Sequence, residues 1–293
     1  MTALKPLIRC REIEGHDLDA VADLLARGFP RRSRDYWSGG LQRQATRAVP
    51  DGYPRYGYLL ENDGSPVGVL LTIYRDRGTA ARPQIWCNLS SWYVEPAFRN
   101  YATMLTRIAQ RRPEATYVNI SAARQTWPII EAQGFRAYCS GLLFSVPAIS
   151  LAGLGARVEQ VAADMQSVAG VPPHEAELLI RHARHGCLSL VVRSTQGDIP
   201  LVLQQVRIRQ GRFALPVMQL IYCRDMSDYV ACAGAIGRFL LRRGYLSIMI
   251  DANGPVAGLI GIYTDRRGRK YIKGPQQARL GDLSDTELPL YGA

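Results

Sequence analysis

The sequence of 293 residues is poor in cysteine and lysine and has no long apolar run. Six cysteines, at positions 10, 87, 139, 187, 223 and 232, form no CxxC pair and mostly lie inside apolar stretches. We therefore expect reduced, buried thiols rather than a disulfide scaffold. No stretch reaches the roughly 18 apolar residues of a membrane helix, and the N-terminus lacks the apolar core of a secretory signal. These absences predict a cytoplasmic protein without a membrane span.

Histidine is also scarce, with four residues in the whole chain. Only His182 and His185 lie close together, on an expected helix, and no Cys or His nearby could complete a zinc site. We therefore expect no metal.

Positive charge exceeds negative charge, but arginine rather than lysine supplies it. The chain has 36 Lys+Arg and 25 Asp+Glu, which gives a net charge of +11. Only Lys5, Lys270 and Lys273 are lysines. Because the arginines are spread along the whole chain, a solvated surface is the leading interpretation. Binding of an acidic ligand, such as a phosphate group or RNA, is the alternative.

The composition, 47% hydrophobic and 21% charged, excludes a disordered chain. The length corresponds to about two domains. Hydrophobic periodicity and turn residues predict alternating helices and strands in the first half. The expected strands are 7–11, 56–61, 67–74, 85–94, 116–121 and one or two within 135–146. The expected helices are 17–27, 33–46 (interrupted by Gly39 and Gly40), 101–112 and 125–133.

The second half repeats much of this order, at an offset of about 130 residues. We expect helices at 172–185 and 227–243 and strands at 187–193, 199–208, 213–222 and 245–250. The repeat predicts a structural duplication, with domains at 1–150 and 151–293. A linking helix is expected around 157–166. Asp251 is expected to cap the following Asn253-Gly254 turn, and the alternative is a catalytic or acceptor-binding carboxylate.

One segment of the first half carries the most specific signal: Trp92-Tyr93-Val94-Glu95-Pro96-Ala97-Phe98-Arg99-Asn100-Tyr101-Ala102-Thr103-Met104. A strand is expected to end at Val94, Pro96 turns the chain, and a helix follows Arg99. Unpaired backbone N–H groups at the positive end of a helix favour a bound anion such as a pyrophosphate. The alternative is an ordinary strand–turn–helix capped by an arginine.

This segment resembles motif A of the GNAT acyltransferase superfamily, V-x-P-x-x-R-G-x-G-x-G/A. In that family the loop holds the pyrophosphate of acetyl-CoA or another acyl-CoA. Val94, Pro96 and Arg99 fit the pattern, whereas Asn100, Ala102 and Met104 replace its glycines, and Met104 is bulky enough to narrow the pocket. The resemblance implies a CoA-binding set made of Trp92, Tyr93, Val94, Arg99, Asn100, Tyr101, Ala102, Thr103 and Met104.

The residues that follow resemble GNAT motif B, in which a strand, a helix and a Gly-Phe pair come in this order. Here the strand ends at 119–121, and Gly134 and Phe135 follow the helix. Many members use a tyrosine four residues before that glycine as the general acid toward the leaving thiolate. Ile130 occupies this position and cannot donate a proton, so Tyr138 or Ser121 would have to substitute. The candidate catalytic residues are Asn119, Ser121 and Tyr138.

The resemblance implies an α/β (α+β) fold of two GNAT-like units, each a mixed, mostly antiparallel sheet flanked by helices. It also implies transfer of an acetyl or acyl group from CoA to an amine or hydroxyl of a small-molecule or peptide acceptor. The strand edge at 92–94 would pair with pantetheine, with the Val94 N–H as carbonyl donor. Tyr36 and Trp37 would form an acceptor wall. The sequence identifies no general base.

Two other functions remain open. The missing tyrosine and glycines are compatible with a non-catalytic, degenerate ligand-binding protein. Fem-type transferases also have two GNAT-like units but take aminoacyl groups from tRNA, which the positive charge would suit; otherwise nucleic acid is not an expected partner. In the second half, the stretch 222–227 lacks the motif, and Asp225 would repel a phosphate. We therefore expect the second unit to be a degenerate partner that completes the acceptor cleft.

Overall fold

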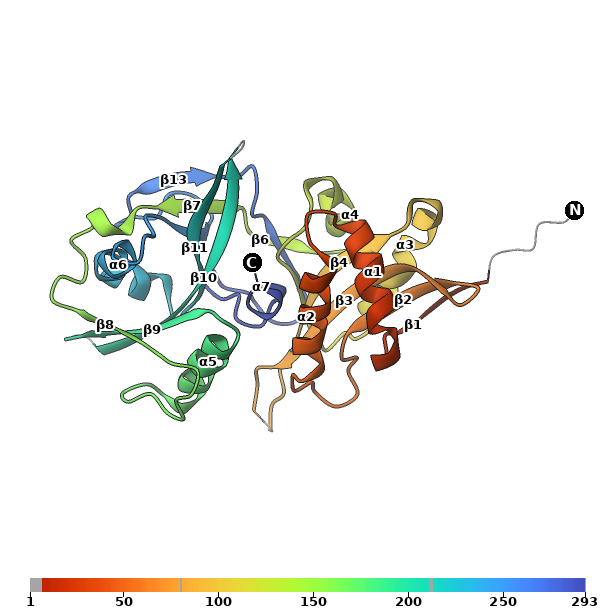
Figure 1. The fold of residues 1–293 in the computed structure, drawn as a ribbon, viewed down its shortest axis with the longest axis horizontal. Coiled ribbons are helices and arrows are strands. Elements are labelled where there is room, and N and C mark those ends of the chain that lie inside the picture. The colour runs from red at the N-terminus through yellow and green to blue at the C-terminus, as the bar shows by residue number, and fades with distance from the viewer. Residues whose placement is uncertain (1–6, 80, 196, 211–212, 293) are drawn as a thin grey trace, which may run out of the picture.

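In the computed structural model, residues 7–79, 81–195, 197–210 and 213–292 are described, and they form two seven-stranded sheets (Figure 1). The first sheet has the order β1-β2-β3-β4-β5-β14-β6 and the second the order β13-β7-β12-β11-β10-β9-β8. Within each sheet, one neighbouring pair is parallel, β4–β5 or β11–β12, and the others are antiparallel. This arrangement confirms the predicted fold class. The strands of the first sheet are β1 (Ile8–Glu12), β2 (Gly57–Asn62), β3 (Ser65–Asp76), β4 (Ile85–Val94), β5 (Thr116–Asn119), β14 (Lys270–Lys273) and β6 (Arg136–Cys139).

The second sheet repeats the first when it is followed from its β8 edge. Its strands are β8 (Arg157–Gln160), β9 (Leu188–Ser194), β10 (Gly197–Gln210), β11 (Phe213–Cys223), β12 (Ile248–Ala252), β7 (Gly141–Ser145) and β13 (Gly261–Thr264). In the parallel pairs, Trp86 lies opposite Thr116 and Met218 opposite Ile248. The two units thus share one strand order, at the expected offset of about 130 residues.

The two halves of the chain exchange one strand each, which the sequence analysis did not predict. β14, from the second half, lies between β5 and β6 of the first sheet, and β7, from the first half, lies between β12 and β13 of the second. The domain boundary at residue 150 stays a prediction, and each sheet contains a strand from the other side of it.

Alternating burial along the strands gives each sheet two packed faces. On the first sheet, Leu59 faces the helices α1 (Leu18–Gly28) and α2 (Arg34–Ala45), whereas Tyr58 and Leu60 face α3 (Ala102–Ala109) and α4 (Trp127–Ala132). The second sheet is covered by α5 (Pro173–Arg184) on one face and α6 (Met226–Leu241) on the other. A short last helix, α7 (Glu287–Tyr291), lies between the two units (Figure 1).

Three local expectations were wrong. The segment expected to be a linking helix begins with β8, because Val158 packs into the core beside α6 while Glu159 pairs with Val191 of β9. Helix α2 runs through both of its glycines without interruption. Asp251 does not cap a turn: it is 3% exposed and lies 2.8 Å from the Lys270 ammonium, so it joins β12 to the exchanged β14.

The cysteines are free thiols, five of them buried and Cys10 partly exposed. His182 is a core residue whose ring nitrogens lie 2.7 and 2.9 Å from the carbonyl oxygens of Leu178 and Ser284. In the described part of the chain, no cluster of three or more His, Cys, Asp or Glu could hold a metal ion. None of the described helices is long and apolar enough to cross a membrane.

Candidate active site

A cleft opens in the first sheet because β4 and β5 separate. They pair only through Trp86, Cys87 and Asn88, although β4 continues to Val94. A bulge lies just beyond the paired segment: Leu71 of β3 is opposite Ser90, whereas Val69 is opposite Tyr93. Ser91, in the bulge, has a φ of 54°, a backbone conformation that non-glycine residues rarely adopt. The bulge bends β4 away from β5 and leaves an unpaired strand edge.

The cleft contains a cavity of about 350 Å³. Five segments of the first half line it, and α7 closes one side. The residues are Phe29, Arg32, Tyr36, Trp37, Leu70, Leu89, Ser90, Ser91, Trp92, Thr106, Gln110, Asn119, Ser121, Ala122, Ala123, Thr126, Ile130, Gln133, Phe135, Glu287, Leu288 and Tyr291. This volume is in the range of small-molecule sites.

Several residues singled out from the sequence meet at this cavity. Tyr36, Trp37, Trp92, Asn119 and Ser121 all line it. Tyr138 lies elsewhere, in a separate cavity of about 220 Å³ that Arg77 and Arg279 also line.

The expected phosphate turn lies beside the cavity rather than on its wall. Residues Pro96–Tyr101 form a short 3-10 helix, and α3 begins at Ala102. Arg99, Asn100, Thr103 and Met104 are exposed, and Met104 does not line the cavity. Tyr93 instead packs against Phe29 and the backbone of Gly28. Directly after α3, Gln110 reaches the cavity, and its Oε1 accepts a 2.9 Å hydrogen bond from Lys273 of the exchanged strand.

The backbone of β4 leaves a donor on the open edge. The Glu95 N–H donates to the Val67 carbonyl of β3 at 2.9 Å, and Val94 lies opposite Gly68. Because successive N–H groups of a strand point to opposite sides, the Val94 N–H points away from β3 and toward the cleft.

The equivalent edge in the second unit is occupied by the chain itself. β11 also has an irregularity in its pairing, at Ile221, and Tyr222 lies opposite Val202 as Tyr93 lies opposite Val69. Here, however, the Cys223 N–H donates to the Gly281 carbonyl at 2.9 Å, and the Leu283 N–H donates to the Ile221 carbonyl at 2.7 Å. The C-terminal segment therefore fills the position that stays open in the first unit.

The same segment brings Glu287 into the cleft of the first unit. Both carboxylate oxygens of Glu287 are inaccessible to solvent and have no hydrogen-bond partner of good geometry among the described residues. Burial raises the pKa of this carboxyl above its ordinary value of 4.5, while Ser121, Asn88 and Lys270 act in the opposite direction. Both polar atoms of the Asn88 side chain are likewise buried and unpaired. A buried carboxylate without a paired cation is unfavourable, which makes this position a candidate binding or catalytic site.

Two sets of contacts hold Glu287 in place. After it, Tyr291 donates to Gln44 at 2.7 Å, and Arg43 donates to the carbonyls of Leu290 and Tyr291 at 2.5 and 2.7 Å. Helix α7 is thereby fixed to α2.

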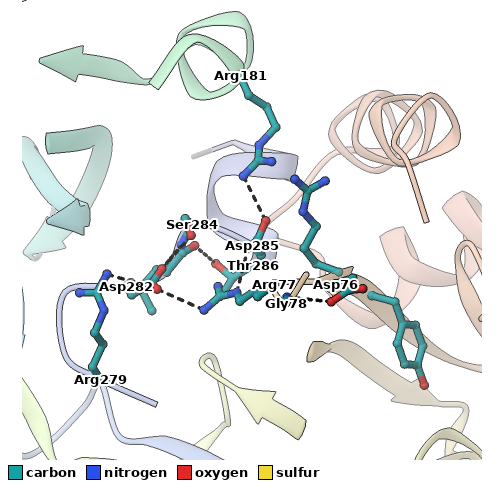
Figure 2. Close-up of polar contacts among 12 residues, drawn as sticks. Asp76, Arg77, Gly78, Arg181, Arg279, Asp282, Ser284, Asp285 and Thr286 are labelled. Carbon is teal, nitrogen blue, oxygen red and sulfur yellow. Dashed lines mark hydrogen bonds and ion pairs between the residues drawn. The ribbon is translucent and has the colours of Figure 1, made fainter. Parts of the chain in front are cut away.

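Before Glu287, a network of ion pairs joins the C-terminal segment to both units (Figure 2). The Asp285 carboxylate lies 2.9 Å from Arg77, at the end of the first hairpin, and 3.2 Å from Arg181 of α5. Asp282 lies 3.1 Å from Arg77 and 3.4 Å from Arg279. Burial alone would raise the pKa of Asp285, but Arg77 and Arg181 outweigh it and hold that pKa well below its ordinary range.

Glu287 was missed by sequence reasoning, which predicted no helix, strand or site residue beyond the turn at 253–254. The only signal was one acidic residue at the start of the otherwise apolar run Glu287-Leu288-Pro289-Leu290-Tyr291. No local pattern shows that this run returns to a cleft formed by the first half.

A scan against protein-family models finds no match, and a search of curated protein sequences finds none. Solved structures, in contrast, match over most of the chain. A GCN5-related N-acetyltransferase from Anabaena variabilis has a TM-score of 0.55 at 11% identity, covering 90% of this chain and 72% of its own. One from Kribbella flavida has a TM-score of 0.53 at 12% identity, with coverage of 93% and 72%. A putative acetyltransferase from Pyrococcus horikoshii has a TM-score of 0.52 at 11% identity, with coverage of 97% and 95%. The chain therefore has the fold of the GCN5-related N-acetyltransferases, with two sheets of the same strand order.

Proposed function

We propose that the cleft of the first unit transfers an acetyl or other acyl group from CoA to an amine or hydroxyl of a small acceptor or peptide. The observation that carries the proposal is the buried Glu287 carboxylate, which lines the cavity and has no ion-pair partner among the described residues. A carboxylate with a raised pKa at such a position suits a general base.

The open side of the first unit fits an acyl-CoA. The turn at Pro96–Tyr101, with the exposed Arg99, would hold the pyrophosphate together with Asn100, Tyr101, Ala102, Thr103 and Met104. The free edge of β4 from Trp92 to Val94 would pair with pantetheine, and the Val94 N–H would donate to the thioester carbonyl. Acyl-CoA supplies the activated acyl group.

On the other side of the cleft, Tyr36 and Trp37 would contact the acceptor, and Glu287 would take its proton. The acceptor then attacks the thioester carbon, the C–S bond breaks, and CoA leaves as a thiolate. Ile130 lies on the wall and has no proton to give. We assign the hydrogen-bonding roles near the thiolate and acceptor to Ser121 and Asn119, whereas Tyr138 stays a prediction without contact to this cavity.

The second unit is proposed to bind no CoA, because residues 281–283 occupy its equivalent strand edge. Its role is then to hold the C-terminal segment that completes the first unit.

The test is titration with acetyl-CoA and longer acyl-CoAs, followed by an assay of CoA thiol release with a panel of amines. Glu287→Gln should bind acetyl-CoA normally but lose about 10²- to 10⁴-fold in the rate of transfer, the usual contribution of a general base. Glu12→Gln, on the half-exposed surface of β1, is the matched control. An unchanged rate in Glu287→Gln would reject Glu287 as the base.

Absence of acetyl-CoA binding at millimolar concentration would reject the whole proposal. If that protein instead bound tRNA with a steep salt dependence, the Fem-type function would be supported. Binding of acyl-CoA without transfer to any amine or alcohol would favour the non-catalytic function.

A further inference from the structure

The cavity carries one charge of each sign, at different depths. Among the described residues, its charged side chains are Glu287, whose carboxylate is inaccessible to solvent, and Arg32, which is exposed at the rim. The Arg32 guanidinium lies 4.4 Å from the centre of the Tyr36 ring, and no acidic side chain of the described chain pairs with it. Tyr36 lies between the two charges: burial mainly raises the pKa of its hydroxyl, Arg32 lowers it and Glu287 raises it.

The wall between these charges is aromatic. Trp37 packs against Phe29, Tyr36 and Tyr291, with ring centres 5.4, 5.0 and 5.9 Å apart. Such a wall offers apolar contact to a carbon skeleton and cation–π contact to an ammonium group.

Neither Glu287 nor Arg32 has an ion-pair partner among the described residues, so a ligand could supply one to each. A buried carboxylate is stabilised by a cation, and an ammonium meets this need better than a neutral hydroxyl. A guanidinium offers a planar fork of donors that matches a carboxylate or phosphate. A cavity with an anion at its base and a cation at its rim is therefore complementary to a zwitterion.

We propose that the acceptor is an amine that also carries an acid group, with its ammonium at Glu287 and its acid group at Arg32. This proposal rests on the proposed function and specifies its acceptor class. The acid group is a carboxylate or a phosphate. On transfer, the ammonium loses one proton to Glu287, the new C–N bond replaces the thioester C–S bond, and the second proton ends on the departing thiolate.

The experiment is calorimetric binding of four matched compounds, with and without saturating CoA. They are 4-(2-aminoethyl)benzoic acid, 4-(2-aminoethyl)phenylphosphonic acid, phenethylamine without the acid group, and 4-ethylbenzoic acid without the amine; the first two carry their charges at opposite ends of one skeleton. We expect one of the two acid-bearing amines to bind about tenfold more tightly than phenethylamine, the low end for a charge-assisted contact because Arg32 is exposed. Which of the two binds better identifies the acid group.

Arg32→Gln should remove this advantage and leave the affinity for phenethylamine unchanged. Arg31→Gln, at the neighbouring exposed arginine outside the cavity, should retain it. Equal binding of phenethylamine and both acid-bearing amines, no change in Arg32→Gln, or no binding of any compound would overturn the proposal. Acyl transfer to phenethylamine would then show that the proposed function stands without this specificity. Binding of an acid-bearing amine without any acyl transfer would show that the cavity recognises such amines although the proposed transferase function fails.

Discussion

The ring of Tyr291 packs directly on Gly40 of α2, leaving no room for a methyl group between them. Glycine weakens a helix interior, so its presence in the middle of α2 needs a reason. The close approach supplies it: α7 can only dock on α2 where a side chain is missing. Because α7 begins with Glu287, this contact sets the position of the candidate base.

We expect Gly40→Ala to disturb both stability and activity. The added methyl group would overlap the Tyr291 ring, and overpacking of this kind costs about 1–3 kcal/mol. Displacement of α7 would also move Glu287, so transfer should fall by more than acetyl-CoA binding does. Urea denaturation and the thiol-release assay measure the two effects.

Gly39→Ala is the matched control in the same helix. A methyl group at position 39 would meet only the flexible end of Arg43, at 3.6 Å. That change should stabilise the helix by about 0.5–1 kcal/mol. Equal stability and equal transfer rates in Gly40→Ala and Gly39→Ala would contradict the claim that α7 docks on α2 at Gly40.

The pH dependence of transfer should report Glu287. A general base acts in its ionised form, and burial raises the pKa of Glu287 above 4.5. The value of kcat should therefore fall as the pH decreases through that raised pKa, at a higher pH than for an ordinary carboxyl group. In Glu287→Gln the residual kcat should not show this decrease at low pH. If the decrease persists in the variant, it arises from the titration of another group.

Asp285→Asn should be strongly destabilising. It removes the close carboxylate partner of Arg181 and one of the two carboxylates on Arg77, which keeps Asp282, so we expect a cost of about 3 kcal/mol in the free energy of unfolding, the low end for a broken buried pair. Because the pKa of Asp285 is held below its ordinary range, the wild type keeps this contribution above the ordinary carboxyl range and loses it as the pH falls. The variant should therefore lose less stability on acidification.

The control for this change is Asp19→Asn. Asp19 also pairs with an arginine, Arg34, but its side chain is 90% exposed. Its removal should leave the free energy of unfolding almost unchanged. Comparable losses in the free energy of unfolding of both variants would mean that the buried ion pairs stabilise the fold no more than an exposed one does.

Acetyl-CoA should bind with a stoichiometry of one per chain. Arg99→Glu should abolish the binding by reversing the charge at the exposed turn, whereas Arg207→Glu, the same change on the exposed surface of β10, should not. Calorimetry gives both the number of sites and the dissociation constants. Two sites per chain would show that residues 281–283 do not block the second unit.

Much of the fold followed from local patterns. The strand ending at Val94, the hairpin of β2 and β3, and the helices α1, α5 and α6 lie where periodicity and turn residues placed them. Tyr36 and Trp37, which were predicted to contact the acceptor, and Asn119 and Ser121 all line one cavity, although their roles stay predictions. These features depend on residues close in sequence or on a motif of known geometry.

The features that were missed depend on contacts between distant parts of the chain. Strands such as Lys270–Lys273 are short, and nothing in four residues specifies pairing with Val118 rather than with a nearer strand. Glu287 likewise gains its environment only when α7 meets α2. Gly40 was interpreted as a break in the helix because its partner, Tyr291, is far away in the sequence.

A fragment of residues 1–150 should not fold by itself. It would lack β14, so β5 and β6 could not be joined, and it would carry the buried Leu142 and Leu143 of β7 without the second sheet. We expect aggregation, visible by size-exclusion chromatography, and rescue by co-expression with residues 151–293. A monomeric, cooperatively unfolding fragment would contradict the importance of the exchange.

The exchanged strands also impose an order on synthesis. When β5 leaves the ribosome, the strand that covers its outer edge is still about 150 residues from being made, which takes on the order of ten seconds at usual translation rates. During this time the first sheet presents an open edge, the kind of surface at which nascent chains associate wrongly. Strand β14 therefore closes the gap in the first sheet, and α7 soon afterwards delivers the candidate base, so the first unit acquires its complete cleft only after most of the second unit has been translated.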